Sequence, residues 1–267
     1  MTPAATTVDR PSTAPIDPRI RARRIAVRRD EGRRRLHRLT ALGVILAVGV
    51  ASVLVTRSPL LDVDRVAVSG AAHTSPDAVR TATGIRRHSP MTDLDLGRAR
   101  DGVLLLPWVK TVSISKQWPG TVKVSVVERN AVAAAPATAG GYVLVDAEGR
   151  LLEAVPAPPA GVAVLVDVAP AGAAGGVLDP SAGATLAVAR ALPKELVPQV
   201  AGVVATADGV ALRLAVGGTV RLGATDGLGP KLLAVATFLA QVDLTDLCTL
   251  DVRVPSAPSL TRGTPCA

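Results

Sequence analysis

The chain has 267 residues and a formal net charge of +8, and only four of its residues are aromatic. Residues 1–38 carry 11 Arg against four acidic residues, a net charge of +7, so the remainder of the chain is close to neutral. This distribution argues against a large basic nucleic-acid-binding domain, and so few aromatic side chains argue against a stacking surface for bases or sugar rings. The residues beyond 57 are numerous enough for one or two domains with their own cores.

Residues 1–38 are expected to form a disordered basic tail on the cytoplasmic side of a membrane. Thr, Pro and Ala dominate the first 18 positions, and Arg clusters alternate with single aliphatic residues in the rest. That alternation is typical of a segment lying on anionic lipid. A nucleic-acid-binding arm would use the same residues, and a third interpretation is that the arginines only set topology. The candidate membrane-surface residues are Arg33, Arg34, Arg35 and Arg38.

Residues 39–56 contain no charged side chain over 18 positions. A helix of this length reaches roughly 27 Å, close to the roughly 30 Å of the bilayer hydrocarbon core. A single span must be helical, because its backbone polar groups find no partners in lipid. The excess of Arg before it predicts a cytoplasmic N-terminus and extracytoplasmic domains after it. A cleavable secretory signal is the alternative, although its apolar region is usually only about 7 to 15 residues.

Residues 58–130 have the pattern of a small α+β domain of order β-α-α-β-β, with one layer of helices on a three-stranded sheet. Ser75 and Pro76 predict a helix N-terminus, and Gly84 the end of that helix. The expected elements are a strand at 63–69, helices at 76–84 and within 92–105, and strands at 109–116 and 121–128.

Both tryptophans bracket the strand at 109–116, Trp108 after Pro107 and Trp118 before Pro119. Such aromatic residues most often seal the ends of a small sheet against its helices, each burying on the order of 150 to 250 Å². We expect this structural role for both, with a binding hot spot as the alternative.

Residues 131–255 are expected to form a second, mostly antiparallel β domain with packed helices, and residues 256–267 a C-terminal tail. An extracytoplasmic location permits a disulfide between Cys248 and Cys266, but the sequence alone favours two unpaired thiols and leaves the pairing open. The expected elements are a hairpin at 142–154, strands at 161–168, 200–205, 210–215, 219–222 and 249–254, and helices at 180–191 and 230–242.

Several short motifs occur together in this chain. They are VDRVAVSG at 63–70, LPWV at 106–109, Trp118-Pro119, Glu128-Arg129 followed by Ala131-Val132-Ala133, RLG at 221–223, Lys231-Leu232 and LDVR at 250–253. As a connected set they resemble the POTRA (polypeptide-transport-associated) domain and second domain of the FtsQ/DivIB family of bacterial cell-division proteins. The resemblance covers about residues 20 to 260.

The resemblance implies a noncatalytic, single-pass scaffold of the plasma membrane at the division septum, linking early and late division proteins. It implies FtsB-like and FtsL-like single-span coiled-coil partners, which in the family add a segment to the edge of the terminal strand. We expect Arg253 to pair with an acidic partner residue and Val252 and Val254 to make apolar contacts. An interior strand without a free edge is the alternative. The candidate partner-binding residues are Leu250, Asp251, Val252, Arg253, Val254 and Leu260.

The sequence contains no recognisable catalytic, cofactor or metal motif. His37, His73 and His88 are not spaced as metal ligands, and no nucleophile elbow, P-loop or G-x-G-x-x-G is present. We therefore expect no enzyme activity, no small-molecule substrate and no nucleic-acid partner. The alternatives are a membrane-anchored envelope hydrolase whose site forms only on folding, a POTRA-type export or chaperone module, and a transmembrane DNA-binding regulator.

Overall fold

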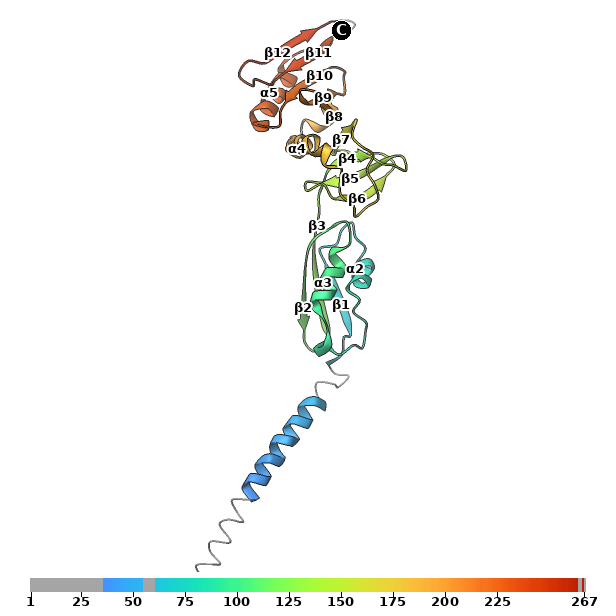
Figure 1. The fold of residues 1–267 in the computed structure, drawn as a ribbon, viewed down its shortest axis with the longest axis vertical. Coiled ribbons are helices and arrows are strands. Elements are labelled where there is room, and N and C mark those ends of the chain that lie inside the picture. The colour runs from blue at the N-terminus through green and yellow to red at the C-terminus, as the bar shows by residue number, and fades with distance from the viewer. Residues whose placement is uncertain (1–35, 55–60, 264–265, 267) are drawn as a thin grey trace, which may run out of the picture. The chain divides into compact units, whose positions relative to one another are not determined.

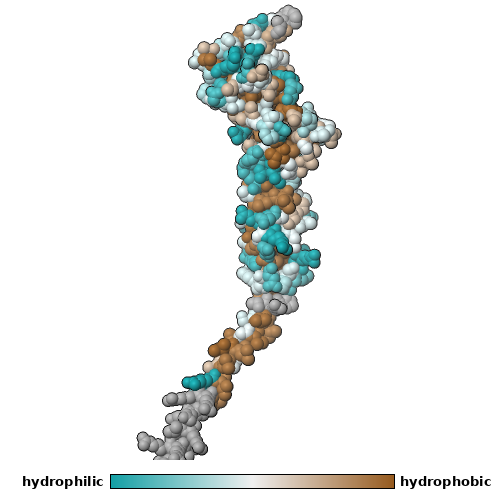
Figure 2. Space-filling view, viewed as in Figure 1, coloured by the Kyte–Doolittle hydropathy of each residue, from teal (hydrophilic) through white to brown (hydrophobic). Residues whose placement is uncertain are grey.

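A computed structural model of the chain describes residues 36–54, 61–263 and 266 (Figure 1). These residues belong to two separate units, one ending at Leu61 and the other beginning at Asp62. The first unit contributes a helix, Leu36–Leu54, with a mean hydropathy of 1.8 and no buried residues, long and apolar enough to cross a membrane. Its apolar side chains are brown in Figure 2. Arg38 lies in its first turn, whereas the other 35 N-terminal residues, including Arg33, Arg34 and Arg35, lie outside the described residues.

The second unit begins with a three-stranded sheet in the order β1-β3-β2. The central strand pairs in parallel with β1 and antiparallel with β2. The hydroxyl of Ser75 caps the first helix by accepting from the Ala78 N–H, and Gly84 ends the helix with a positive φ. The predicted order β-α-α-β-β is confirmed. The elements are β1 (Arg65–Ser69), α2 (Pro76–Thr83), a 3-10 turn (Met91–Asp93), α3 (Leu96–Leu104), β2 (Val109–Gln117) and β3 (Thr121–Glu128).

The core of this first domain lies between the sheet and its two helices. Val122, Val124 and Val126 alternate along β3 on one face and pack against Val79 of α2 and Val103 of α3. Alternation in the strand and helical spacing in the helices thus place aliphatic side chains on one shared surface.

The rest of the unit is one mixed sheet of nine strands in the order β12-β11-β10-β9-β8-β7-β4-β5-β6. Five of its neighbouring pairs are antiparallel; β4–β7, β7–β8 and β10–β11 are parallel. The strands are β4 (Ala131–Pro136), β5 (Tyr142–Asp146), β6 (Leu151–Val155), β7 (Ala163–Val166), β8 (Val200–Thr206), β9 (Gly209–Leu214), β10 (Thr219–Gly223), β11 (Leu247–Asp251) and β12 (Ser259–Arg262).

Helices cover this sheet and complete its core. Helix α4 (Gly183–Ala191) contributes Val188, and α5 (Leu228–Gln241) contributes Leu232 and Val235, to a cluster that includes Leu165 and Leu212 of the sheet. Two short 3-10 turns, Pro180–Ala182 and Val197–Gln199, precede α4 and β8. The α+β class and the mostly antiparallel second domain are confirmed, with parallel pairs that the sequence did not indicate.

Two strands were not predicted from the sequence. β4 is an Ala-rich segment of weak strand propensity, yet three of its residues are fully buried between β5 and β7. β12 lies in residues 256–267, which were expected to be a tail, and its four residues are all exposed. Both strands form because neighbouring strands supply backbone partners, a contribution that local patterns do not contain.

Candidate functional site

The strand predicted to offer a free edge is an interior strand. β11 pairs in parallel with β10 and antiparallel with β12, and the Val252 N–H donates to the Arg221 carbonyl at 3.0 Å. Leu250 is 1% exposed and Val252 is fully buried. The prediction of an edge at residues 250–254 is therefore wrong, because the chain turns after Arg253 and returns as β12 to cover β11. A proline at 252 would break a bond inside the sheet.

The edge at this end of the sheet is β12. Its register places Ser259 opposite Asp251, Leu260 opposite Leu250 and Thr261 opposite Thr249. In an antiparallel pair, successive residues direct their backbone groups alternately toward the neighbour and away from it. Among the described residues no further strand pairs with β12, so half of its backbone donors and acceptors face outward.

The opposite edge of the sheet, β6, is covered at its start by the loop before α4. The Leu151 N–H donates to the Gly176 carbonyl at 2.9 Å, and the Gly175 N–H donates to the Leu151 carbonyl at 2.8 Å. The backbone of Arg150 also pairs with that of Val177 in an isolated antiparallel β-bridge. Backbone partners within the chain thus occupy part of this edge, whereas β12 has them on one side only.

Three of the predicted partner-binding side chains lie at the surface, Leu260 on β12 itself and Arg253 and Val254 in the segment between β11 and β12, where Arg253 lies over Gly223 of β10. Val254 is 58% exposed, Leu260 is 36% exposed, and the Arg253 side chain is about half exposed. The guanidinium of Arg253 already has a partner, since its Nη2 lies 2.7 Å from Asp251 Oδ2 and its Nε also donates to that carboxylate. These hydrogen bonds hold the pKa of Asp251 below its usual range. Contact of Arg253 with an acidic partner would therefore require an exchange of partners.

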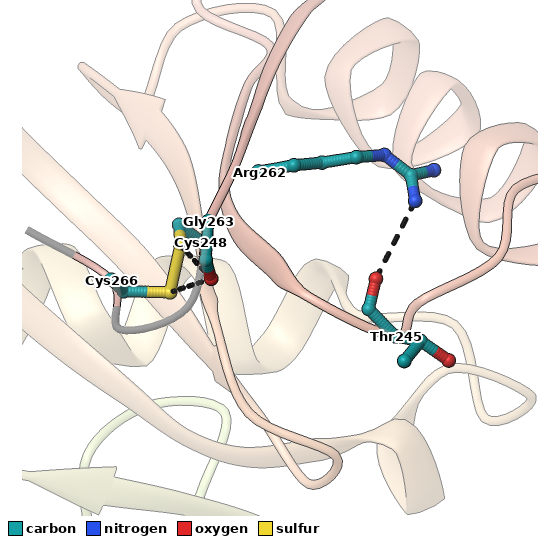
Figure 3. Close-up of a disulfide and its surroundings, with 5 residues drawn as sticks. All are labelled: Thr245, Cys248, Arg262, Gly263 and Cys266. Atoms are coloured by element: carbon teal, nitrogen blue, oxygen red, sulfur yellow. Dashed lines mark hydrogen bonds between the residues drawn. A yellow bond between two sulfur atoms is a disulfide. The ribbon is translucent and has the colours of Figure 1, made fainter.

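A disulfide joins Cys248 of β11 to Cys266, with Cα atoms 5.3 Å apart (Figure 3). Both sulfur atoms lie near the Gly263 carbonyl oxygen, which follows the last residue of β12. The Arg262 guanidinium donates to the carbonyls of Thr245 and Asp243 (3.4 and 3.0 Å). The sequence left the pairing of the cysteines open; the structure joins them, and the bridge fastens the chain just after β12 to the neighbouring strand.

The two tryptophans have different environments. Trp108 is 8% exposed and packs on Ala134, Leu144 and Leu152 of the second domain, while its Nε1 donates to Glu153 at 3.2 Å. Trp118 is 55% exposed. The prediction that both seal the three-stranded sheet is wrong, because Trp108 packs against the next domain and Trp118 projects from a turn.

Within residues 36–54, 61–263 and 266, no group of three or more His, Cys, Asp or Glu is arranged to hold a metal ion. The candidate site is therefore the backbone edge of β12, which is followed by the disulfide between Cys248 and Cys266.

Comparison with known proteins agrees with this architecture. A family model described as POTRA domain, FtsQ-type, matches residues 61–129, and one described as cell division protein FtsQ/DivIB, C-terminal, matches residues 134–253. Cell division protein FtsQ of Streptomyces bingchenggensis is 32% identical over 87% of this chain and 91% of its own length. Cell division protein FtsQ of Mycobacteroides abscessus is 30% identical over 83% of this chain and 68% of its own length. The chain belongs to the FtsQ/DivIB family of cell division proteins.

Proposed function

We propose that this protein is a noncatalytic, single-pass scaffold of the division machinery that recruits other envelope proteins through β12. The N-terminal tail is cytoplasmic, with Arg33, Arg34, Arg35 and Arg38 at the lipid surface. The POTRA domain (58–130) and the β domain (131–255, extended by β12) are extracytoplasmic and work at the septum. Family membership supports this assignment, as does the helix Leu36–Leu54, which among the described residues is the one long and apolar enough to cross a membrane.

The observation that carries the proposal is the open edge of β12. A strand four residues long offers few hydrogen bonds alone, but an extended segment of a partner can continue the sheet along it by β-augmentation. Exposed Leu260 and Val254 supply apolar contacts beside the edge, and Arg253 exchanges Asp251 for an acidic partner residue. Buried Leu250 and Val252 support the strand from inside. The partner is a segment of an FtsB-like or FtsL-like single-span protein.

The test uses the alternation of backbone groups along β12. Leu260 and Thr261 are consecutive, so the N–H of one faces β11 and the N–H of the other faces outward. We expect Leu260→Pro and Thr261→Pro to differ: one variant frays β12 from β11, and the other keeps its thermal stability but loses partner capture. The measurement is photocrosslinking in living cells with a probe at Ser259, followed by identification of the captured protein.

A probe at Val216, which is 67% exposed, serves as the matched control and should capture no division protein. Equal capture from positions 216 and 259, or undiminished capture by both proline variants, would rule out the β12 edge as the binding site. Topology is tested separately by fusing alkaline phosphatase after residue 267, where an active enzyme supports an extracytoplasmic C-terminus and an inactive one contradicts it.

A further inference from the structure

The turn between β2 and β3 carries an exposed indole side chain that is not part of the β12 site. Trp118 is 55% exposed, and Pro119 beside it is also exposed. An isolated exposed apolar residue is common on soluble domains and needs no explanation. This tryptophan, however, lies at the end of the domain that follows the membrane span in the chain.

The turn is fastened to the first residues of the POTRA domain. The Gly120 carbonyl accepts hydrogen bonds from the N–H groups of Asp64 (2.8 Å) and Arg65 (3.3 Å). There is no room for a side chain at position 120, because a Cβ there would lie 2.2 Å from Asp64 Oδ2 and 2.8 Å from the Asp62 carbonyl oxygen. Trp118 is therefore held next to the point where the domain begins.

Basic side chains belong to the same end of the domain. The Val63 N–H donates to the Ser89 carbonyl, and the His88 N–H donates to the Val63 carbonyl, both at 2.9 Å. The loop containing the exposed Arg86 and Arg87 thus lies against residue 63, while Lys116 precedes the tryptophan turn. Arg65, whose N–H bonds the turn, is a further exposed base, and Asp62 and Asp64 add two acidic groups, so the charge of this end is mixed.

Chain connectivity limits how far this end can lie from the bilayer. The apolar run ends at Thr56, and the six peptide steps from there to Asp62 cannot reach further than about 21 Å. The headgroup layer beyond the hydrocarbon core is itself about 5 to 8 Å thick. Tryptophan is enriched in that layer, where its ring lies among apolar chains and its N–H contacts water or headgroups.

We propose that the turn 117–120 rests in the headgroup layer of the membrane that the same chain spans, with Trp118 inserted and Arg86, Arg87 and Lys116 near lipid phosphates. The inference relies on the membrane span of the proposed function but not on β12 or on any partner. The occupant is lipid, since the short tether keeps the turn near that surface whether or not a partner is bound.

The test uses the full chain in nanodiscs of phosphatidylcholine with one quarter phosphatidylglycerol. Because the chain has two tryptophans, Trp108→Phe leaves Trp118 as the only indole, and Trp118→Phe leaves the buried Trp108. We expect lipids brominated near the headgroup to quench Trp118 at least twofold more strongly than Trp108. Insertion should also shift the Trp118 emission maximum to a shorter wavelength than that of a fully water-exposed indole.

The matched control places an indole at the other end of the same domain. Leu105 is 77% exposed, and its carbonyl accepts from Arg150 of the second domain, so Leu105→Trp in a chain lacking both natural tryptophans reports an exposed ring away from the turn. Quenching of Trp118 no stronger than that of this control would overturn the inference. Replacing Arg86 and Arg87 together by Glu should weaken Trp118 quenching by about half, whereas an unchanged signal contradicts the role of the phosphate contacts.

The result separates this inference from the proposed function. Absence of quenching in a chain that stays in the nanodisc and still crosslinks through β12 in cells overturns the lipid contact alone. Release of the chain from the nanodisc overturns the membrane span and with it both proposals. Quenching that disappears only when a partner protein is added shows that the lipid contact exists and is displaced.

Discussion

The two ends of strand β2 carry the same residue types, a tryptophan beside a proline, in opposite surroundings. Trp108 is buried, stacks on the His73 ring with centroids 4.1 Å apart, and packs against the second domain. Trp118 stands exposed at the other end. The comparison shows that a local motif does not determine exposure; the neighbouring part of the chain does.

The Trp108 end is a joint between the POTRA and β domains. Arg129, directly after β3, makes ion pairs with Asp146 and Glu148 at the turn between β5 and β6. Lys110 of β2 reaches the same Glu148 at 2.8 Å. Burial alone would raise the pKa of Asp146, but the hydrogen bond from Arg129 and those from the turn lower it. Charges thus fasten this end around the aromatic stack, and the Trp118 end has no such joint in the described residues.

Truncation of each tryptophan gives the largest expected contrast. Trp108→Ala leaves a cavity between two domains and should lower the free energy of unfolding by about 4 kcal/mol. Trp118→Ala removes an exposed ring and should change it by less than about 0.5 kcal/mol. Urea unfolding of the full chain in nanodiscs, followed by circular dichroism, measures both. Similar losses for the two variants would mean that Trp108 is packed no more tightly than Trp118.

The buried carboxylate of the joint gives the next effect. Asp146 is 2% exposed and accepts from the Arg129 guanidinium and from the N–H groups of Glu148 and Arg150. Asp146→Ala leaves these donors without their acceptor and should cost about 3 kcal/mol. Glu148→Ala, at a half-exposed side chain, is the control and should cost less than about 1 kcal/mol in the same measurement. A larger loss from the control would place the main charge contact at Glu148.

A pH titration tests the same end of the POTRA domain. Burial alone would raise the pKa of Glu128, but hydrogen bonds from the N–H groups of His73 and Thr74 (2.9 and 2.8 Å) outweigh it and lower the pKa to about 2. The usual value is 4.5, so folding favours the carboxylate, and this contribution is present above about pH 4.5 and lost as the pH falls toward 2. We expect a loss on the order of 2 kcal/mol across that range.

Glu128→Gln should remove most of this acid dependence, and the exposed Glu195→Gln should leave it unchanged. Unfolding free energies at several pH values between 2 and 6 provide the measurement. A wild-type curve that stays flat over this range would show that the N–H groups around Glu128 do not bind its charged form more tightly.

The sequence predicted this fold where local signals were strong and missed what depends on distant neighbours. Ser75 and Gly84 mark the ends of α2, and alternating valines mark β3, so these elements could be predicted. β12 could not, because Ser259–Arg262 has no apolar alternation and its pairing with β11 exists only in the folded chain. Because β12 was not predicted, the sheet edge was assigned to β11 instead of β12.

The smallest expected effect is the loss of the exposed Lys110 charge, compared with the loss of the less exposed Arg129 charge at the same joint. Lys110 and Glu148 form an ion pair whose side chains are each about half exposed, so Lys110→Met should change the free energy of unfolding by less than about 0.5 kcal/mol. Arg129→Met removes a much less exposed partner and leaves the buried Asp146 carboxylate uncompensated, which should cost about 3 kcal/mol. Because salt screens exposed pairs more than buried ones, raising ionic strength should erase the Lys110 effect and leave most of the Arg129 effect. Equal salt sensitivity of both variants would indicate that the joint is open to water.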